Sequence, residues 1–245
     1  MCFCLALRAG APFSLDRCTR RRVGLHIPDG YLDPAWCVAT AAVVALYAFA
    51  ALRRLRGSLT PDRVAAASVL AAAVFAAQML NWPIPGGTSL HFVGGALAGI
   101  LFGPWLGFLV LAMVVTTQAV VFHDGGLTTL GANLFNMAVV DVVVGYTVYR
   151  AVTGLLGDSR RARLVAAFLA GWLGIAVAGA VAGIEIGLSP SFPYGVEVTL
   201  PVMAGWHLLL GLVEGVITAL VVDQLYARRS PLVLEAGRLA AQTPA

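Results

Sequence analysis

The sequence predicts an all-α integral membrane protein, a bundle of about seven transmembrane helices with the N-terminus outside and the C-terminus in the cytoplasm. Three observations lead to this prediction. Of the 245 residues, 60% are hydrophobic and 11% are charged, against about 25% charged residues in a soluble domain. The mean hydropathy is +0.87, and apolar runs of about 20 residues recur along the chain. The basic residues are all arginine and, from residue 53 onward, gather between alternate runs.

The apolar runs locate the helices. Uninterrupted spans are expected over residues 34–52, 64–80, 130–149, 165–188 and 200–226. The run at 92–122 is too long for one straight span, and Gly103-Pro104 is expected to divide it into a short helix and a full one. Residues 81–90 contain two prolines and two glycines, and they are predicted to form a loop or a re-entrant segment. Residues 123–126 are predicted to form a turn.

Arginine placement predicts the orientation of the bundle. The loops after the first, fifth and seventh spans carry Arg53, Arg54, Arg56, Arg63, Arg150, Arg160, Arg161, Arg163, Arg228, Arg229 and Arg238. The opposite side is expected to hold residues 25–33, 81–91, 123–129 and 189–199, which contain no arginine. Because loops rich in arginine stay in the cytoplasm, we place the first group inside and predict a cytoplasmic tail over residues 227–245.

Residues 1–24 do not fit this pattern and are treated as a doubtful extension. They would place Arg8, Arg17, Arg20, Arg21 and Arg22 outside, and they lack the long apolar core of a signal peptide. We therefore predict that translation begins at position 25, on a TTG or CTG codon read as methionine. Removal of the segment by proteolysis is the alternative. The membrane domain then covers residues 25–226.

The composition excludes several kinds of chemistry. The chain has no lysine, so it has neither a phosphate-loop lysine nor a Schiff-base lysine. We predict that the protein is not an enzyme and that any ATP-driven transport takes its ATPase from a partner. The cysteines Cys2, Cys4, Cys18 and Cys37 do not follow the spacing of a zinc site. We expect no organic cofactor and no nucleic-acid partner.

Three of the four histidines, His26, His91 and His123, are predicted to lie near the outer face. Imidazole binds nickel, copper, zinc and cobalt, so the grouping suggests a cation site, although each histidine could also lie alone at the interface. If Leu25 is the first residue, its terminal amine, the amide of His26 and the His26 imidazole can occupy three corners of a square. His91 is the best candidate for the fourth corner, and a square of nitrogens favours Ni(II) or Cu(II).

Other polar residues near the outer face are expected to orient these ligands. They are Asp29, Thr88, Ser89, Asp124, Asn133 and Asn136. Asn133 and Asn136 lie three residues apart and share a helix face, where hydrogen bonding between helices is the alternative role.

Four polar residues lie inside predicted spans, where they are costly and mark candidates for function. They are Asp141, Glu185, His207 and Glu214. His207 and Glu214 are seven residues apart on one helix face, and we favour a structural pair between them over a place in an ion path. Asp223 is expected at the membrane interface, and Gly179 and Gly183 are expected in a close contact between helices.

Four blocks of sequence together resemble one family. They are Leu25-His26-Ile27-Pro28-Asp29-Gly30 and the segments 87–95, 122–137 and 207–218. The blocks occur in order over residues 25–226, and the 65 residues from His26 to His91 are similar to the family's spacing. The chain resembles the CbiM/NikM family, the substrate-binding membrane components of energy-coupling-factor (ECF) cobalt and nickel transporters, a class of ABC transporter.

The resemblance implies a function, ligands and partners. The function is high-affinity capture and uptake of nickel or cobalt (Ni²⁺ or Co²⁺) across the cytoplasmic membrane of a bacterial or archaeal cell. The ligands are His26, His91 and the amine and amide at the true N-terminus. The partners are a coupling transmembrane subunit, cytoplasmic ATPase subunits and a small accessory membrane protein, within membrane lipid. Two positions depart from the family: Leu25 replaces its methionine, behind 24 further residues, and His123 replaces a glutamine and could add a ligand.

Two other functions stay open. A self-sufficient secondary cation transporter would use Asp141, Glu185 and Glu214 as a proton path, and it predicts inverted halves that the sequence does not display. An intramembrane metalloenzyme would need clustered ligands such as H-E-x-x-H, which the chain lacks. Neither explains the Leu25-His26 motif. Nickel and cobalt are both open, and square-planar nitrogen coordination favours nickel.

Overall fold

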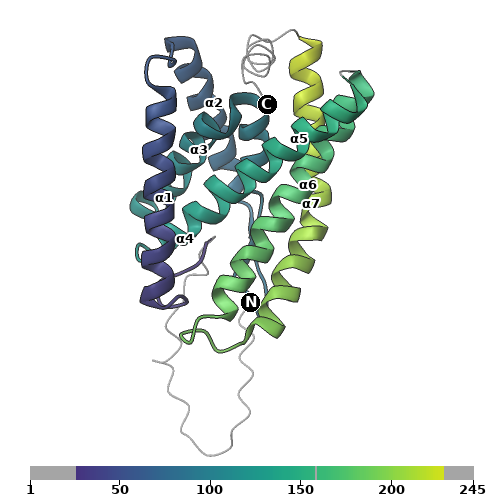
Figure 1. Cartoon of the computed structure of the whole chain (residues 1–245). Helices are drawn as coiled ribbons and strands as arrows, with labels where there is room; N and C mark the ends of the chain where they lie inside the picture. The colour runs from purple at the N-terminus through teal and green to yellow at the C-terminus, as the bar shows by residue number, and fades with distance from the viewer. Residues whose placement is uncertain (1–25, 158, 229–245) are drawn as a thin grey trace, which may run out of the picture.

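The structure, a computed structural model, describes residues 26–157 and 159–228, which form a bundle of helices with one short β-hairpin (Figure 1). The elements in chain order are α1 (Pro34–Leu55), α2 (Pro61–Gln78), β1 (Asn81–Pro83), β2 (Ser89–His91), α3 (Gly95–Val121), α4 (Leu130–Leu134), a π-helix (Phe135–Asp141), α5 (Val142–Leu156), α6 (Arg160–Gly187) and α7 (Val196–Ala227). The predictions about residues 1–24, about Leu25 and about the tail after residue 228 lie outside the described residues.

Short polar side chains determine where three of the helices begin. Asp33, Thr60 and Ser159 each accept a hydrogen bond from an amide in the first turn of α1, α2 and α6. Such caps pair amides that the start of a helix otherwise leaves without a partner. The caps extend the helices beyond their apolar runs, so that α2 begins at Pro61 and α6 at Arg160, a few residues before the predicted starts.

The prediction that Gly103-Pro104 divides the third apolar run is confirmed. α3 leaves the helical conformation at Gly103, where φ is 74° and ψ is 175°, a backbone conformation that glycine adopts without a Cβ clash. Pro104 then begins the second half, where the first turn needs no amide. The first half, 95–102, rises only about 12 Å, against roughly 30 Å for the hydrocarbon core of a bilayer. It is a helical segment and not a full span.

Fewer helices are long and apolar enough to cross a membrane than the number of helical segments in the bundle. By length and composition, five helices of the described residues could cross one: Pro34–Leu55, Gly95–Val121, Leu130–Leu156, Arg160–Gly187 and Val196–Ala227. The sequence predicts about seven spans, and the described residues reach that number of helical segments only if α2 and both halves of α3 are counted separately.

The segment at 130–156 contains a feature that the sequence did not predict. Between α4 and α5 the chain continues as a π-helix without a break. A π-helix has more residues per turn than an α-helix, so it rotates the side chains that follow it around the axis. Asn136 and Asp141 both lie in this stretch and both are buried.

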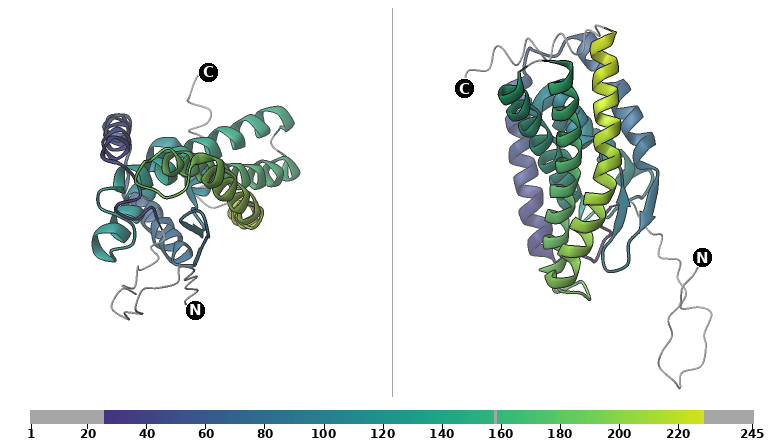
Figure 2. Two further views of the ribbon diagram at one scale, coloured as in Figure 1. Left: turned by 90° about the horizontal axis from the view of Figure 1, so that it is seen from below. Right: turned by 90° about the vertical axis from the view of Figure 1, so that its right-hand side faces the viewer.

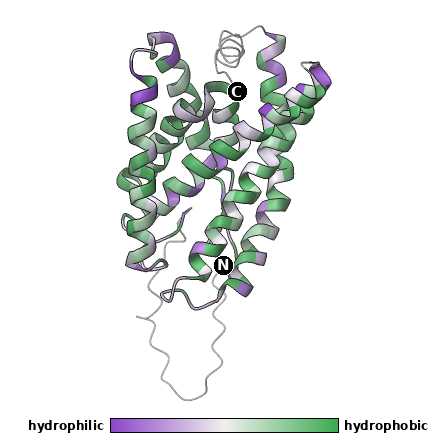
Figure 3. Cartoon of the chain, in the orientation of Figure 1, coloured by the Kyte–Doolittle hydropathy of each residue, from purple (hydrophilic) through white to green (hydrophobic). Residues whose placement is uncertain are grey.

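The loops that carry arginine meet at one end of the bundle. In Figure 1 the α1–α2 and α5–α6 connections and the end of α7 lie at the top, whereas the segment before α1 and the α6–α7 connection lie at the bottom. Figure 3 shows hydrophilic residues at the top ends of α1, α2 and α6 and mainly apolar residues between the two ends. All described arginines lie in or near the top loops, so the two ends differ in charge as predicted.

The β-hairpin presents His91 to the interior. β1 and β2 pair antiparallel with Asn81 opposite His91, and the hairpin lies beside the lower half of α7 (Figure 2). The turn of the hairpin packs closely on that helix, because a Cβ on Gly87 would lie 2.7 Å from the sulfur of Met203. This contact fixes the hairpin against the bundle.

A small apolar core surrounds the segment that precedes α1. Its buried members are Ile27, Leu32, Ile84, Ala132, Ala182, Ile186 and Met203, which come from this segment, the hairpin, α4, α6 and α7. Burial of Ile27 and Leu32 stabilises their position by about 1.5–3 kcal/mol each. Residues 26–32 are therefore anchored between the helices, and His26 is anchored with them.

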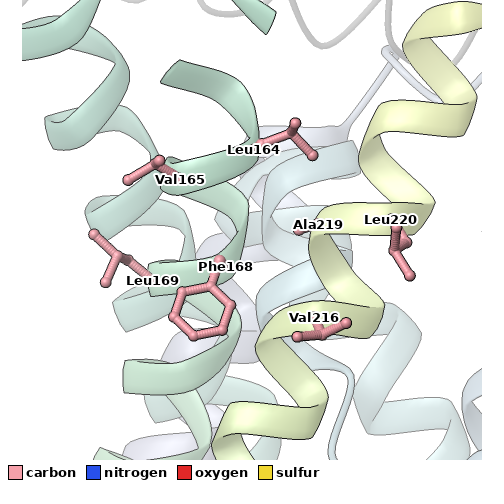
Figure 4. A pocket seen from close by; sticks show the side chains of 7 residues that line it. All are labelled: Leu164, Val165, Phe168, Leu169, Val216, Ala219 and Leu220. Carbon is pink, nitrogen blue, oxygen red and sulfur yellow. The ribbon is translucent and has the colours of Figure 1, made fainter. Parts of the chain in front are cut away.

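A shallow apolar groove lies between α6 and α7 toward the arginine end (Figure 4). Its volume is about 310 Å³, and it is lined by Leu164, Val165, Phe168, Leu169, Val216, Ala219 and Leu220. No lining side chain is polar, so the groove offers no ligand for a metal ion.

Candidate metal site

Two histidines that are 65 residues apart in the sequence lie together in the structure. His26 precedes α1 and His91 ends β2, and their ring centroids are 5.0 Å apart with the ring planes at 59°. Both side chains are buried, with 3% and 6% of their surface exposed. Two buried imidazoles at this separation can bind the same metal ion.

The ring of His26 has polar atoms that the protein leaves unpaired. Nδ1 and Nε2 are both buried and neither makes a hydrogen bond of good geometry, although the backbone of Asp124 lies close enough to act to raise the pKa of the ring. Buried polar atoms in proteins are generally paired. Burial first, and the neighbouring His91 second, lower the pKa of His26 well below its ordinary value. The ring is therefore neutral at pH 7, and neutral imidazole is the form that binds a transition metal.

The ring of His91 is oriented by the adjacent backbone. Its Nδ1 lies 2.8 Å from the carbonyl oxygen of Phe92, a contact that fits Nδ1 as the nitrogen that carries the proton. Nε2 then carries the lone pair. Histidine ligands of metals commonly donate their other ring nitrogen to a carbonyl in this way, which fixes the tautomer and the ring orientation.

Asn133 in α4 holds the residue that follows His26. Its Oδ1 accepts a hydrogen bond from the Ile27 amide at 2.9 Å, and its Nδ2 donates to the Ile27 carbonyl at 3.1 Å. The Thr129 hydroxyl donates to the same carbonyl at 2.6 Å. Asn133 thus positions the main chain beside His26, and Thr129, which the sequence reasoning missed, assists it. A threonine directly before a predicted helix was the available signal.

Asp29 ties the same segment to the loop before α4. Its carboxylate accepts hydrogen bonds from the Thr128 amide at 2.8 Å, from the Thr128 hydroxyl at 2.5 Å and from the Leu127 amide at 3.3 Å. Partial burial acts to raise the pKa of Asp29, but the hydrogen bonds from Thr128, Leu127 and Thr129 outweigh it and lower the pKa. Asp29 therefore anchors the loop, and its carboxylate oxygens accept their hydrogen bonds from it.

Two glycines allow this loop to approach His26. Gly125 has φ of +95°, and a Cβ on it would lie 2.9 Å from the Cβ of His26. A Cβ on Gly126 would overlap Asp29, while the Gly126 amide donates to the Ile27 carbonyl at 3.1 Å. A larger residue at either position would push the loop away from the histidine.

The remaining residues predicted near the site lie at different distances from it. His123 is exposed and has φ of 53°, and no group of three or more His, Cys, Asp or Glu side chains that could hold a metal ion occurs within residues 26–157 and 159–228. The third-histidine cluster is therefore not formed. The Asp124 amide donates to the Gln118 carbonyl at 2.9 Å. Ser89 is buried in β2, and the Thr88 hydroxyl lies 4.0 Å from the sulfur of Met203.

Asn136 bonds across helices instead of turning toward the histidines. Its Nδ2 donates to Oε2 of Glu185 in α6 at 2.7 Å, and both residues are buried. This is the interhelical role that the sequence left as the alternative for the two asparagines. Asn133 and Asn136 therefore have separate functions despite their shared helix face.

The predicted pair between His207 and Glu214 is wrong. The Nδ1 atom of His207 lies 2.7 Å from the carbonyl oxygen of Met203 in its own helix. Glu214 reaches the start of α3, where its carboxylate accepts hydrogen bonds from the Val93 and Gly94 amides at 3.0 and 2.7 Å. The partial positive charge of a helix N-terminus attracts a carboxylate more strongly than a neutral histidine does.

Asp141 adds a third contact at the same helix start. Its Oδ2 accepts a hydrogen bond from the Gly95 amide at 2.8 Å. Two of the three acidic residues that the sequence places inside spans, Asp141 and Glu214, therefore pair three successive amides of residues 93–95.

Glycines in α6 let it pack closely against α7, as predicted. A Cβ on Gly179 would overlap the ring of His207, and a Cβ on Gly183 would lie 2.9 Å from the Thr199 carbonyl oxygen. Asp223, expected at the interface, forms a salt bridge of 2.7 Å with Arg160.

The sequence analysis did not identify two buried glutamines, Gln78 and Gln118. Gln78 donates from Nε2 to the Val93 carbonyl at 2.8 Å. Gln118 is fully buried in α3, with no hydrogen-bond partner for either of its side-chain polar atoms. A lone glutamine within an apolar run was the signal that could have identified both.

Comparisons with known proteins point in one direction. Residues 26–232 match a protein family described as CbiM, cobalt uptake substrate-specific transmembrane region. A protein of Archaeoglobus fulgidus that carries the name of a fused nickel transport protein, NikMN, is 55% identical over 213 residues, 85% of this chain and 68% of that protein. The fused nickel transport protein NikMN of Rhodobacter capsulatus is 36% identical over 90% of this chain and 66% of that protein. The cobalt transport protein CbiM of Sorangium cellulosum is 34% identical over 88% of this chain and 98% of that protein.

The fold is also that of solved structures. A crystal structure of a truncated transition metal transporter has a TM-score of 0.79 and 36% identity, and the match covers 83% of this chain and 99% of that one. A crystal structure of a transition metal transporter has the same TM-score with 35% identity over 87% of this chain and 99% of that one. The chain spans about two thirds of the fused relatives and nearly all of these shorter proteins.

Proposed function

Because this chain belongs to the CbiM family of metal transport proteins, we propose that it is the substrate-specific membrane subunit of an ECF transporter that takes up Ni²⁺ or Co²⁺. A coupling transmembrane subunit, ATPase subunits and a small accessory membrane protein would supply the other parts. The absence of a phosphate-loop motif from the sequence and the presence of a further segment in the fused relatives support this division of work.

The observation that carries the proposal is the buried pair His26 and His91. The two rings lie 5.0 Å apart, and His26 keeps both ring nitrogens unpaired in the interior. Leaving such atoms unpaired costs free energy, and a bound metal ion would remove that cost at one of them. The protein segments around the rings are already held by Asn133, Thr129 and the hairpin, so little ordering is needed on binding.

We propose that the ligands are the two imidazoles together with the terminal amine of a chain that begins at Leu25 and the amide of His26. Four nitrogens in a square favour Ni²⁺ over Zn²⁺ or Mg²⁺, and Co²⁺ could use the same ligands. Release would require the segment before α1 to move away from His91, which breaks the square.

The proposed orientation places the histidine end outside and the arginine end in the cytoplasm of a bacterial or archaeal cell. It follows from the positive-inside rule and from the grouping of arginine at one end of the bundle (Figure 1). The ion would then be captured from the outer face. The alternative, a proton path through Asp141, Glu185 and Glu214, has less support, because Asp141 and Glu214 are engaged by backbone amides.

The test is nickel binding by the chain purified from its own host, with its first residue established by terminal peptide sequencing. We expect one Ni²⁺ per chain by titration calorimetry, and we expect His26→Ala and His91→Ala to abolish it. His123→Ala should leave the affinity close to that of the unaltered chain, because His123 is exposed. Nickel binding that survives both of the first two substitutions would contradict the proposed site.

A further inference from the structure

The chain passes from His91 into α3 through residues 92–95, called the linker below. Side chains from three other elements pair backbone groups of this linker. Glu214 of α7 binds the amides of Val93 and Gly94, and Asp141 of the π-helix binds the amide of Gly95. The carbonyl of Val93 accepts a hydrogen bond from Gln78 of α2 at 2.8 Å. These residues are 15 to 121 positions away from the linker in the sequence, so only the folded bundle assembles this arrangement.

The linker packs closely against α2. Gly94 has φ of +76°, and a Cβ on it would lie 2.9 Å from a methyl group of Val74. The linker thus packs against Val74 of α2 and is also bound by the Glu214 carboxylate of α7. One residue, Phe92, separates Val93 from His91, and its carbonyl orients the His91 ring.

We propose that Glu214 is a positioning residue that holds His91 in the geometry required for metal binding. This inference rests on the proposed function of the histidine pair. Glu214 acts through the backbone amides that its carboxylate binds. It fixes both the Val93 and Gly94 amides with one carboxylate, and through them it sets the direction in which the chain leaves β2 and the place where the Phe92 carbonyl meets the ring.

Charge makes Glu214 suited to this task. A carboxylate accepts two amide hydrogen bonds at once, one on each oxygen, and bonds to a charged acceptor are stronger than neutral ones. It also lies at the N-terminus of α3, where the helix dipole favours negative charge. A consequence is that two hydrogen bonds link α7 to the segment directly after His91, so a displacement of α7 relative to α3 would move the ligand.

The experiment uses the full chain and Ni²⁺ alone, and it follows both the affinity and the ligand-field absorption band of the bound ion. Glu214→Gln keeps the size of the side chain but offers the two amides a single carbonyl oxygen. We expect the affinity to fall about 10- to 100-fold, the range found for residues that orient metal ligands. We also expect the band to shift, because the fourth nitrogen is displaced.

Two further variants sharpen the result. Gln78→Met removes the hydrogen bond to Val93 from the other side and should weaken binding in the same direction, which keeps the test open if Glu214→Gln does not fold. Asp223→Asn removes a carboxylate from the far end of the same helix, where it pairs with Arg160, and should change neither the affinity nor the band.

The outcomes separate the possible explanations. If folded Glu214→Gln and Gln78→Met bind nickel with unaltered affinity and an unshifted band, the positioning role is overturned. A lower yield of folded protein with an unshifted band in the remainder shows a purely structural role and overturns it as well. If the unaltered chain binds no nickel, the proposed function fails, and this inference fails with it.

Discussion

Asn133 pairs with both main-chain polar groups of Ile27, the residue that follows His26, although 106 residues separate the two in the sequence. A side-chain amide is suited to this contact because it offers a donor and an acceptor next to each other. The result is that a non-helical segment before the first helix is held in one place, with the imidazole of His26 buried in the interior.

Substitution of Asn133 should therefore affect metal binding without removing a ligand. We expect Asn133→Ala to lower the nickel affinity of the full chain about 10- to 100-fold, because the segment that carries His26 loses its anchor. The measurement is titration calorimetry. Thr147→Ala serves as the comparison, since the Thr147 hydroxyl bonds only within its own helix and its loss should leave the affinity unaltered. Equal affinities in the two variants would contradict this role.

Gly125 should tolerate no side chain. Gly125→Ala forces a Cβ toward that of His26 at a position with φ of +95°, so we expect a lower unfolding temperature and weaker nickel binding. Gly154→Ala is the matched control. Gly154 lies inside α5 with nothing within 4 Å of its added Cβ, and alanine there should be neutral or stabilise the helix by up to about 1 kcal/mol. Thermal unfolding in detergent, with and without Ni²⁺, measures both.

The contact between α6 and α7 should depend on Gly179. Gly179→Ala places a methyl group into the ring of His207, and overpacking of this kind costs about 1–3 kcal/mol. Gly205→Ala adds the same methyl group on α7 where nothing lies within 4 Å, and it should be tolerated. Comparison of the two unfolding temperatures tests the contact. An unchanged temperature for Gly179→Ala would show that the helices can separate without loss.

Asp29 should make the loop before α4 sensitive to acid. Hydrogen bonds from Thr128 and its neighbours lower the pKa of this carboxyl despite its partial burial. A lowered pKa in the folded state means that the anchoring is fully present above the ordinary pKa of aspartate and is lost as the pH falls through the lowered value. We expect amide exchange at Leu127 and Thr128 to accelerate below about pH 4. In Asp29→Asn, exchange corrected for the intrinsic pH effect should lose this acid-dependent step.

The orientation can be tested by chemical labelling. In a cysteine-free background, Ser191→Cys in the α6–α7 connection should react with an impermeant maleimide added outside the cell. Leu59→Cys in the α1–α2 loop should react only after the membrane is opened. Both side chains are exposed in the structure, so accessibility alone does not distinguish them. The reverse pattern would place the arginine end outside, against the positive-inside rule.

The parts of this protein that depend on local pattern could be predicted from the sequence. Apolar runs of spanning length require helices, because a lipid environment leaves no other partner for backbone amides and carbonyls. The break at Gly103-Pro104 follows from the backbone preferences of those two residues. The grouping of arginine in alternate loops predicts two ends of different charge. The motif around His26 and the second histidine at His91 were also visible, and they led to the family.

The contacts that complete the candidate site could be decided only by the tertiary structure. The sequence suggested a pair between His207 and Glu214 because they share a helix face, but Glu214 binds the start of α3, 120 residues away. The same holds for Asn133 with Ile27. The π-helix, which places Asp141 at that same helix start, could not be predicted from the apolar pattern. Partners of this kind are chosen by which unpaired amides the packing of the helices brings within reach, and the sequence alone does not contain those distances.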